Sequence, residues 1–149
     1  MGISLIGPIW LVLLVLALVG TIVWSAKSRF YALLSRRSIV AAVMPGVVMV
    51  VGFYALAVHM HTALGGWPKC IGEAGFPPAL VKHANWTLWY FGAMILAIVF
   101  AWPVAVGLCS AAPRLRRFIA HLSLFAGSFV VCFGLMLLGP SKFLYWWWD

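Results

Sequence analysis

The stretch SIVAAVMPGVVMVVGFYALAV, residues 38–58, decides the fold because it contains no Lys, Arg, Asp or Glu. About 20 apolar residues in a helix span the roughly 30 Å hydrocarbon layer of a membrane. In lipid the backbone must form its hydrogen bonds internally, and the stretch lacks the alternating pattern of a barrel strand. The sequence therefore predicts a membrane-spanning helix here.

Three further uncharged stretches of similar length occur at residues 3–24, 86–108 and 118–139. The whole chain of 149 residues is 66% hydrophobic and 8% charged, whereas soluble domains are about 25% charged. We predict one all-α domain over residues 1–149, an integral membrane four-helix antiparallel bundle. Residues 3–24 have no basic segment before them, so we expect a retained span rather than a secretory signal.

The basic residues predict the orientation of the bundle. Lys and Arg are enriched in cytoplasmic loops, and most of the ten basic residues lie in loops 25–37 and 109–117. These residues are Lys27, Arg29, Arg36, Arg37, Arg114, Arg116 and Arg117. Both termini and the long loop 59–85 are then non-cytoplasmic, in a bacterial inner membrane or its equivalent.

Tryptophans gather where the outer headgroup layer is expected. Trp and Tyr favour membrane interfaces because their rings are apolar at one end and polar at the other. The candidate interface anchors are Trp67, Trp86, Trp89, Trp146, Trp147 and Trp148. The tail 143–149 is predicted to be an interfacial segment or a contact with a partner subunit.

Small residues predict where helices approach one another closely. Ala93, Ala97, Ala101 and Ala105 recur every four residues and form one narrow ridge on the third span. Gly46 and Gly127 mark shorter versions of such a face on the second and fourth spans. Pro45 and Pro103 fall inside spans, where each removes a backbone donor and is expected to bend its helix.

Four histidines are the candidate cofactor or metal ligands. An antiparallel hairpin would bring His59 or His61 to the height of His83, near the outer surface. Because His59 and His61 are two residues apart, a regular helix cannot direct both at one ion. His121 lies near the cytoplasmic end of its span and cannot share that site. Hydrogen bonding to carbonyls and headgroups is one interpretation of these histidines, and binding of haem or a transition metal is the other.

Several function classes are disfavoured by the composition. The net charge of +8 is divided among short loop clusters, which suits anionic lipid headgroups better than nucleic acid. No Asp, Glu, Lys or Arg lies inside a predicted span, which disfavours proton-coupled transport. Cys70, Cys109 and Cys132 lie in different segments, so they predict no disulfide framework.

The favoured function is a small noncatalytic accessory or structural subunit of a larger membrane complex, such as a respiratory, photosynthetic or other redox assembly. Its partners would be the lipid bilayer and other membrane protein subunits. The alternative is a membrane redox protein with haem or metal at the outer surface. A further alternative is a small channel or a lipid-handling protein.

Overall fold

The computed structural model describes residues 19–21, 23, 34–68 and 76–148. Most of the predicted first span 3–24 lies outside the described residues, as do Lys27 and Arg29. The described part of the chain forms helices and contains no strand. The all-α class is therefore confirmed for these residues.

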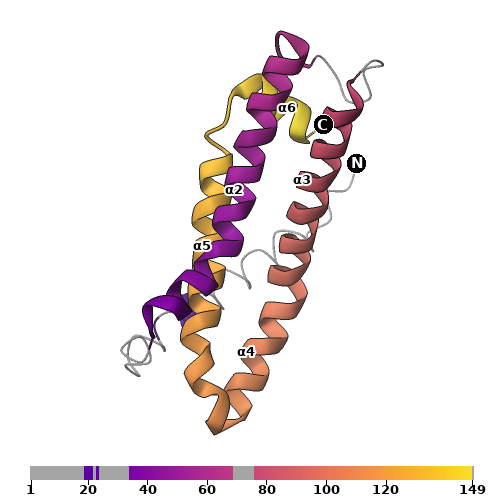
Figure 1. Cartoon of the computed structure of the whole chain (residues 1–149). Coiled ribbons are helices and arrows are strands. Elements are labelled where there is room, and N and C mark those ends of the chain that lie inside the picture. The colour runs from indigo at the N-terminus through magenta and orange to yellow at the C-terminus, as the bar shows by residue number, and fades with distance from the viewer. Residues whose placement is uncertain (1–18, 22, 24–33, 69–75, 149) are drawn as a thin grey trace. The chain divides into compact units, whose positions relative to one another are not determined.

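Five α-helices, one π-helix and one 3-10 helix follow one another along the part of the chain described between residues 36 and 148 (Figure 1). In chain order they are α2 (Arg36–Leu64), α3 (Pro78–Leu96), the π-helix η2 (Ala97–Ala101), α4 (Trp102–Ala111), the 3-10 helix η3 (Pro113–Phe118), α5 (Ile119–Met136) and α6 (Ser141–Trp148).

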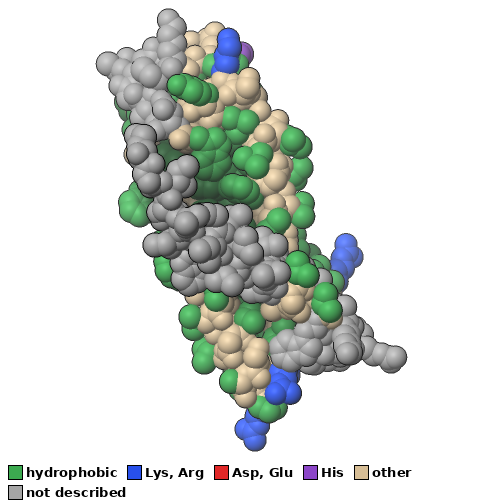
Figure 2. Space-filling view, turned by 180° about the vertical axis from the view of Figure 1, so that it is seen from behind, with side chains coloured by type: hydrophobic (Ala, Val, Ile, Leu, Met, Phe, Trp, Pro, Cys, Tyr) green, Lys and Arg blue, Asp and Glu red, His purple; other side chains and the backbone are tan. Residues whose placement is uncertain are grey.

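Three helical segments within the described residues are long and apolar enough to cross a membrane. They are Arg36–Leu64, Pro78–Ala111 and Pro113–Met136. The first two contain the predicted second and third spans, and the last covers the predicted fourth span, 118–139, as far as Met136. The most apolar windows of these segments are only 22%, 17% and 33% buried inside the molecule. Most of each span therefore faces outward, and Figure 2 shows hydrophobic side chains over much of the described surface.

The loop predicted at residues 59–85 is shorter than the sequence suggested. α2 continues to Leu64 and α3 already begins at Pro78, so both helices extend beyond the predicted span ends at residues 58 and 86. Hydropathy marks the part of a helix that favours lipid, whereas the backbone bonds can continue into the polar interface, so helix ends and predicted membrane boundaries differ.

Local residues explain where α2 begins and ends. Ser35 precedes the helix, and its Oγ accepts a hydrogen bond from the Ser38 N–H at 3.2 Å, as an N-cap does. Gly65 follows the helix with a φ of 65°, the left-handed conformation that commonly ends helices and suits glycine.

The two intramembrane prolines differ in their surroundings. α2 passes through Pro45 as an α-helix, and the Tyr90 hydroxyl donates a hydrogen bond of 3.1 Å to the Pro45 carbonyl. Pro103 instead follows directly on the π-helix Ala97–Ala101 and Trp102. The wider π turn is a known way for a helix to accommodate a residue that disturbs its hydrogen-bond ladder.

The described residues divide into two compact units. The first unit takes its residues from the ranges 1–43 and 96–128, and the second from 44–95 and 129–149. In the first unit Ile98, Trp102, Ile119 and Ser123 are buried, and the Trp102 Nε1 donates a hydrogen bond of 2.9 Å to the Leu122 carbonyl. The second unit contains the candidate site. Its most buried side chains are those of Phe53, Leu56, Met60, Leu80, Met136 and Phe143.

Candidate functional site

The second unit brings His59 of α2 and His83 of α3 together. Their Nδ1 atoms are 2.9 Å apart, and the ring centroids are separated by 5.2 Å. One Nδ1 must donate and the other must accept, so the two imidazoles hold different hydrogen-bonding states. The pair therefore links the two helices directly near the 65–77 connection.

Local bonds fix the backbone that carries this pair. The Thr62 hydroxyl donates to the carbonyls of Val58 and His59, both at 3.0 Å. On the facing helix the Thr87 hydroxyl donates to the His83 carbonyl, also at 3.0 Å. Both threonine hydroxyls thus donate their hydrogen bonds to carbonyls of their own helix. They do not compete for the imidazole nitrogens, which bond to each other.

The other two histidines lie elsewhere. His61 is exposed and its ring lies 4.8 Å from that of Trp67, so it does not join the His59–His83 pair. His121 belongs to the first unit, where its ring lies 5.9 Å from Phe118 and its buried Nδ1 has no hydrogen-bond partner. Helical periodicity explains the first result, because residues two apart on a helix face nearly opposite directions.

The separation of the paired nitrogens restricts what they could bind. Metal–nitrogen bonds are about 2.0–2.1 Å long, so two nitrogens at a right angle around one ion lie about 2.9 Å apart. The two axial nitrogens of a haem iron bind on opposite faces, so their bonds of the same length add and the nitrogens lie about 4 Å apart. The observed 2.9 Å fits adjacent ligands of a transition metal better than axial haem ligands. The described residues contain no group of three or more His, Cys, Asp or Glu side chains suited to one ion.

An aromatic cluster surrounds Phe53, in the middle of α2. We define this cluster as Phe53, Phe91, Phe133, Phe143 and Trp147. Phe53 lies 4.9 Å from Phe143 and 5.2 Å from Trp147 between ring centroids, and Phe91 lies 5.6 Å from Trp147. The cluster joins α6 to α2 and α3, and Figure 1 shows α6 beside α2.

The predicted interface anchors fall into two groups. Trp146 and Trp147 are buried against the rest of the second unit, whereas Trp148 is 49% exposed. Trp86 and Trp89 of α3 are 69% and 79% exposed. Trp67 is half-buried beside His61. α6 is amphipathic, and its inward face carries the rings that contact the cluster.

The predicted alanine ridge is not a packing face between described helices. Ala93 and Ala101 are exposed, and Ala97 and Ala105 are only partly covered. The buried residues of the same helical segment are Met94, Ile98 and Trp102, each of which directly follows one of these alanines in the sequence. Of the two glycines, Gly46 is buried, and a Cβ at Gly127 would meet no atom within 4 Å.

The described charges are all basic. Arg36 and Arg37 are exposed at the start of α2, and Arg114, Arg116 and Arg117 are exposed on η3. Arg117 lies over the Phe118 ring at 5.0 Å, and Arg116 Nε donates to the Ser110 carbonyl at 3.4 Å. Both acidic residues of the chain, Glu73 and Asp149, lie outside the described residues, as does Cys70.

Sequence reasoning missed the tyrosines that connect the helices of the second unit. The Tyr54 hydroxyl donates to the Leu135 carbonyl at 2.8 Å, and Tyr90 donates to Pro45 as described. A usable signal was present, because a phenol within a span must find an acceptor where water is scarce. The partner could not be named without the tertiary structure.

Comparisons of this chain with protein-family models, with curated proteins and with solved structures find no match.

Proposed function

We propose that this chain is a noncatalytic accessory or structural subunit that packs against other subunits of a larger membrane complex. The observation that carries the proposal is the uncovered part of the alanine ridge in the first unit, Ala97, Ala101 and Ala105, none of which is buried. Small side chains give a lipid tail little to contact, but they allow another helix to approach closely.

The outward face of the spans supports the same proposal. A row of large side chains lies beside the ridge, and its members Leu96, Phe100 and Val104 are 58%, 65% and 62% exposed. A row of small residues beside a row of large ones lets a facing helix come close at the small residues and contact the large ones. A helix of a partner subunit would therefore find shape complementarity here. A redox assembly is one class of complex that such a subunit could serve.

The experiment is purification in mild detergent with identification of stoichiometric partners. Ala101→Phe adds a ring to the ridge and is expected to release the partner, whereas Val131→Phe enlarges an exposed side chain on a different helix, α5, and is the matched control. Both variants should insert and remain helical. Retention of the same partner by Ala101→Phe, or a wild-type chain that purifies without partners, would contradict the proposal.

We also propose the full topology, with residues 3–24 as a fourth span and both termini on the non-cytoplasmic side. The charge asymmetry of the loops supports it, because Arg36, Arg37 and the arginines of η3 are all exposed at helix ends. Accessibility tags at the amino terminus and in 113–118 should label from opposite sides of the membrane. Labelling from the same side would refute this topology.

A second candidate function, binding of a transition metal, is favoured by the His59–His83 geometry. The two Nδ1 atoms are at the spacing of adjacent ligands, so an ion could bind beside the line that joins them if the rings rotate and the bridging proton is released. Metal analysis of the purified chain should find one ion per chain, lost in His83→Ala and kept in His61→Ala. A metal-free wild type after incubation with zinc or copper would exclude this function.

A further inference from the structure

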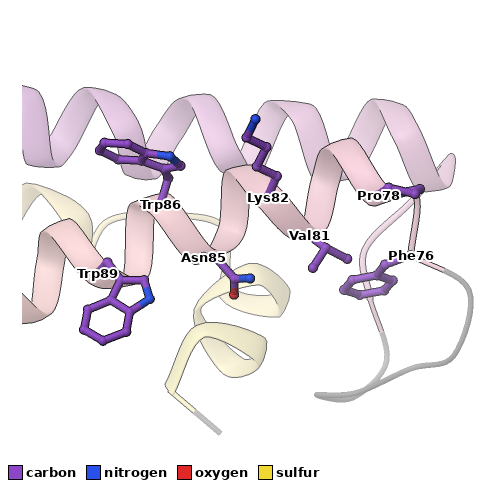
Figure 3. Close-up of a pocket in the computed structure, with 7 residues that line it drawn as sticks. All are labelled: Phe76, Pro78, Val81, Lys82, Asn85, Trp86 and Trp89. Atoms are coloured by element: carbon purple, nitrogen blue, oxygen red, sulfur yellow. The ribbon is translucent and has the colours of Figure 1, made fainter.

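A groove runs along the first three turns of α3 in the second unit. It has a volume of about 660 Å³ and is lined by Phe76, Pro78, Val81, Lys82, Asn85, Trp86 and Trp89. Figure 3 shows Lys82 and Trp86 projecting from one side of α3, and Val81, Asn85 and Trp89 from the other. These are two adjacent rows with four-residue spacing, and the groove lies along them.

Phe76, Pro78 and Val81 form an apolar end of the groove, and from Lys82 onward polarity changes in the order expected for a lipid. The ammonium of Lys82 and the carboxamide of Asn85 lie nearer the start of the helix, and the rings of Trp86 and Trp89 follow one turn further on. A phospholipid has the same order, with a charged phosphate followed by apolar chains. The exposed tryptophans, 69% and 79%, provide two flat apolar walls for those chains.

The charge of the groove selects an anion. Lys82 is exposed, and the described residues contain no carboxylate that could pair with it. The whole chain has ten Lys and Arg against two Asp and Glu, so most of its cations cannot be neutralised within the chain. At a membrane surface the available anions are lipid headgroups, and each Lys near an anionic surface contributes about 1 kcal/mol of attraction.

We propose that this groove binds one anionic phospholipid, with the phosphate at Lys82 and Asn85 and an acyl chain along Trp86 and Trp89. Asn85 can donate its amide hydrogens to the phosphate oxygens that Lys82 does not occupy. The groove recognises the headgroup by charge and the tail by apolar contact. A zwitterionic lipid carries a cation that would face Lys82, so it should bind less tightly.

Native mass spectrometry of the full chain in detergent tests this proposal, with phosphatidylglycerol and phosphatidylcholine of identical acyl chains titrated separately. Wild type is expected to retain one phosphatidylglycerol preferentially. Lys82→Gln should weaken that binding about fivefold, the equivalent of about 1 kcal/mol, and leave phosphatidylcholine unchanged. The side chain is exposed, so this change leaves the packing intact, and circular dichroism checks that the helix content is the same.

The matched control is Lys142→Gln, which removes an exposed lysine of α6 in the same unit. It should bind phosphatidylglycerol as wild type does. Equal weakening in both variants would show diffuse charge attraction and overturn the proposal, as would equal retention of the two lipids by wild type. Displacement of the lipid by equimolar inorganic phosphate would overturn it too, because the acyl chain would then contribute nothing.

Discussion

Two pairs of tryptophans in this protein share a sequence signature but not an environment. Trp86 and Trp89 lie near the start of a long apolar helix, and Trp146 and Trp147 lie in the short tail helix α6. The first two side chains are 69% and 79% exposed, whereas the second two are 8% and 7% exposed. Composition alone assigns all four to the membrane interface.

The difference arises from the turn between α5 and α6. Gly139 and Pro140 follow α5, and the Leu144 N–H bonds to the Pro140 carbonyl as α6 begins. The turn places α6 against Phe53 and Phe91, where Trp147 completes the aromatic cluster. On α3 no described helix covers Trp86 and Trp89, which line the groove. Whether a tryptophan is buried or exposed therefore depends on the helices that pack against it and not on its residue type.

The largest expected effect is on the stability of the aromatic cluster. Trp147→Ala should lower the free energy of unfolding by about 3–5 kcal/mol, because a buried ring is lost and a cavity remains. Trp89→Ala should change it by less than about 0.5 kcal/mol, as at other exposed positions. Equilibrium unfolding in mixed detergent micelles measures both. Similar losses in the two variants would remove the distinction between the tryptophan pairs.

An intermediate effect is expected at Gly139, which abuts the same cluster. A Cβ there would lie 3.1 Å from Phe53 Cε1 and 3.1 Å from the Met136 carbonyl oxygen. Gly139→Ala should therefore destabilise the protein by about 1–3 kcal/mol through overpacking. Gly134→Ala, where a Cβ meets nothing within 4 Å, should be neutral or stabilising, since alanine favours a helix. The same unfolding assay measures both variants. If Gly139→Ala is as stable as wild type, the Phe53 ring moves aside freely and the prediction is wrong.

The smallest expected effect on stability is the loss of one hydrogen bond, tested by comparing a hydrogen-bonded tyrosine with an exposed one. Tyr54→Phe removes the hydrogen bond to the Leu135 carbonyl and should cost about 1 kcal/mol. Tyr145, which is 67% exposed on α6, provides the control, and Tyr145→Phe should leave the unfolding midpoint unchanged. If the two variants unfold alike, the bond from Tyr54 adds no net stability.

Much of the fold was predictable because the cost of charge in lipid acts on each residue separately. Uncharged runs located three helices among the described residues that are long and apolar enough to span a membrane, although α2 and α3 extend beyond those runs. The interface between helices was harder to predict. The alanine ridge was expected to be a packing face, yet no member of it is buried, because the spacing of small residues does not say which neighbour uses them.

The candidate site was predictable in part. Helical periodicity separated His59 from His61, and an antiparallel hairpin placed one of them at the height of His83. Only the structure identified His59 as that residue, at 2.9 Å. The groove was not predicted, because its lining residues were interpreted as interface anchors and loop residues before α3 was known to begin at Pro78.

The sequence by itself determined an all-helical class with helices long and apolar enough to span a membrane, since hydropathy is a sum over single residues and needs no knowledge of neighbours. The tertiary structure alone decided which aromatic rings are buried, which histidines meet and where α6 folds back. Those outcomes depend on contacts between residues far apart in the chain, such as Phe53 with Trp147 and His59 with His83. A one-dimensional pattern of polarity cannot specify such contacts, because many pairings satisfy the same pattern.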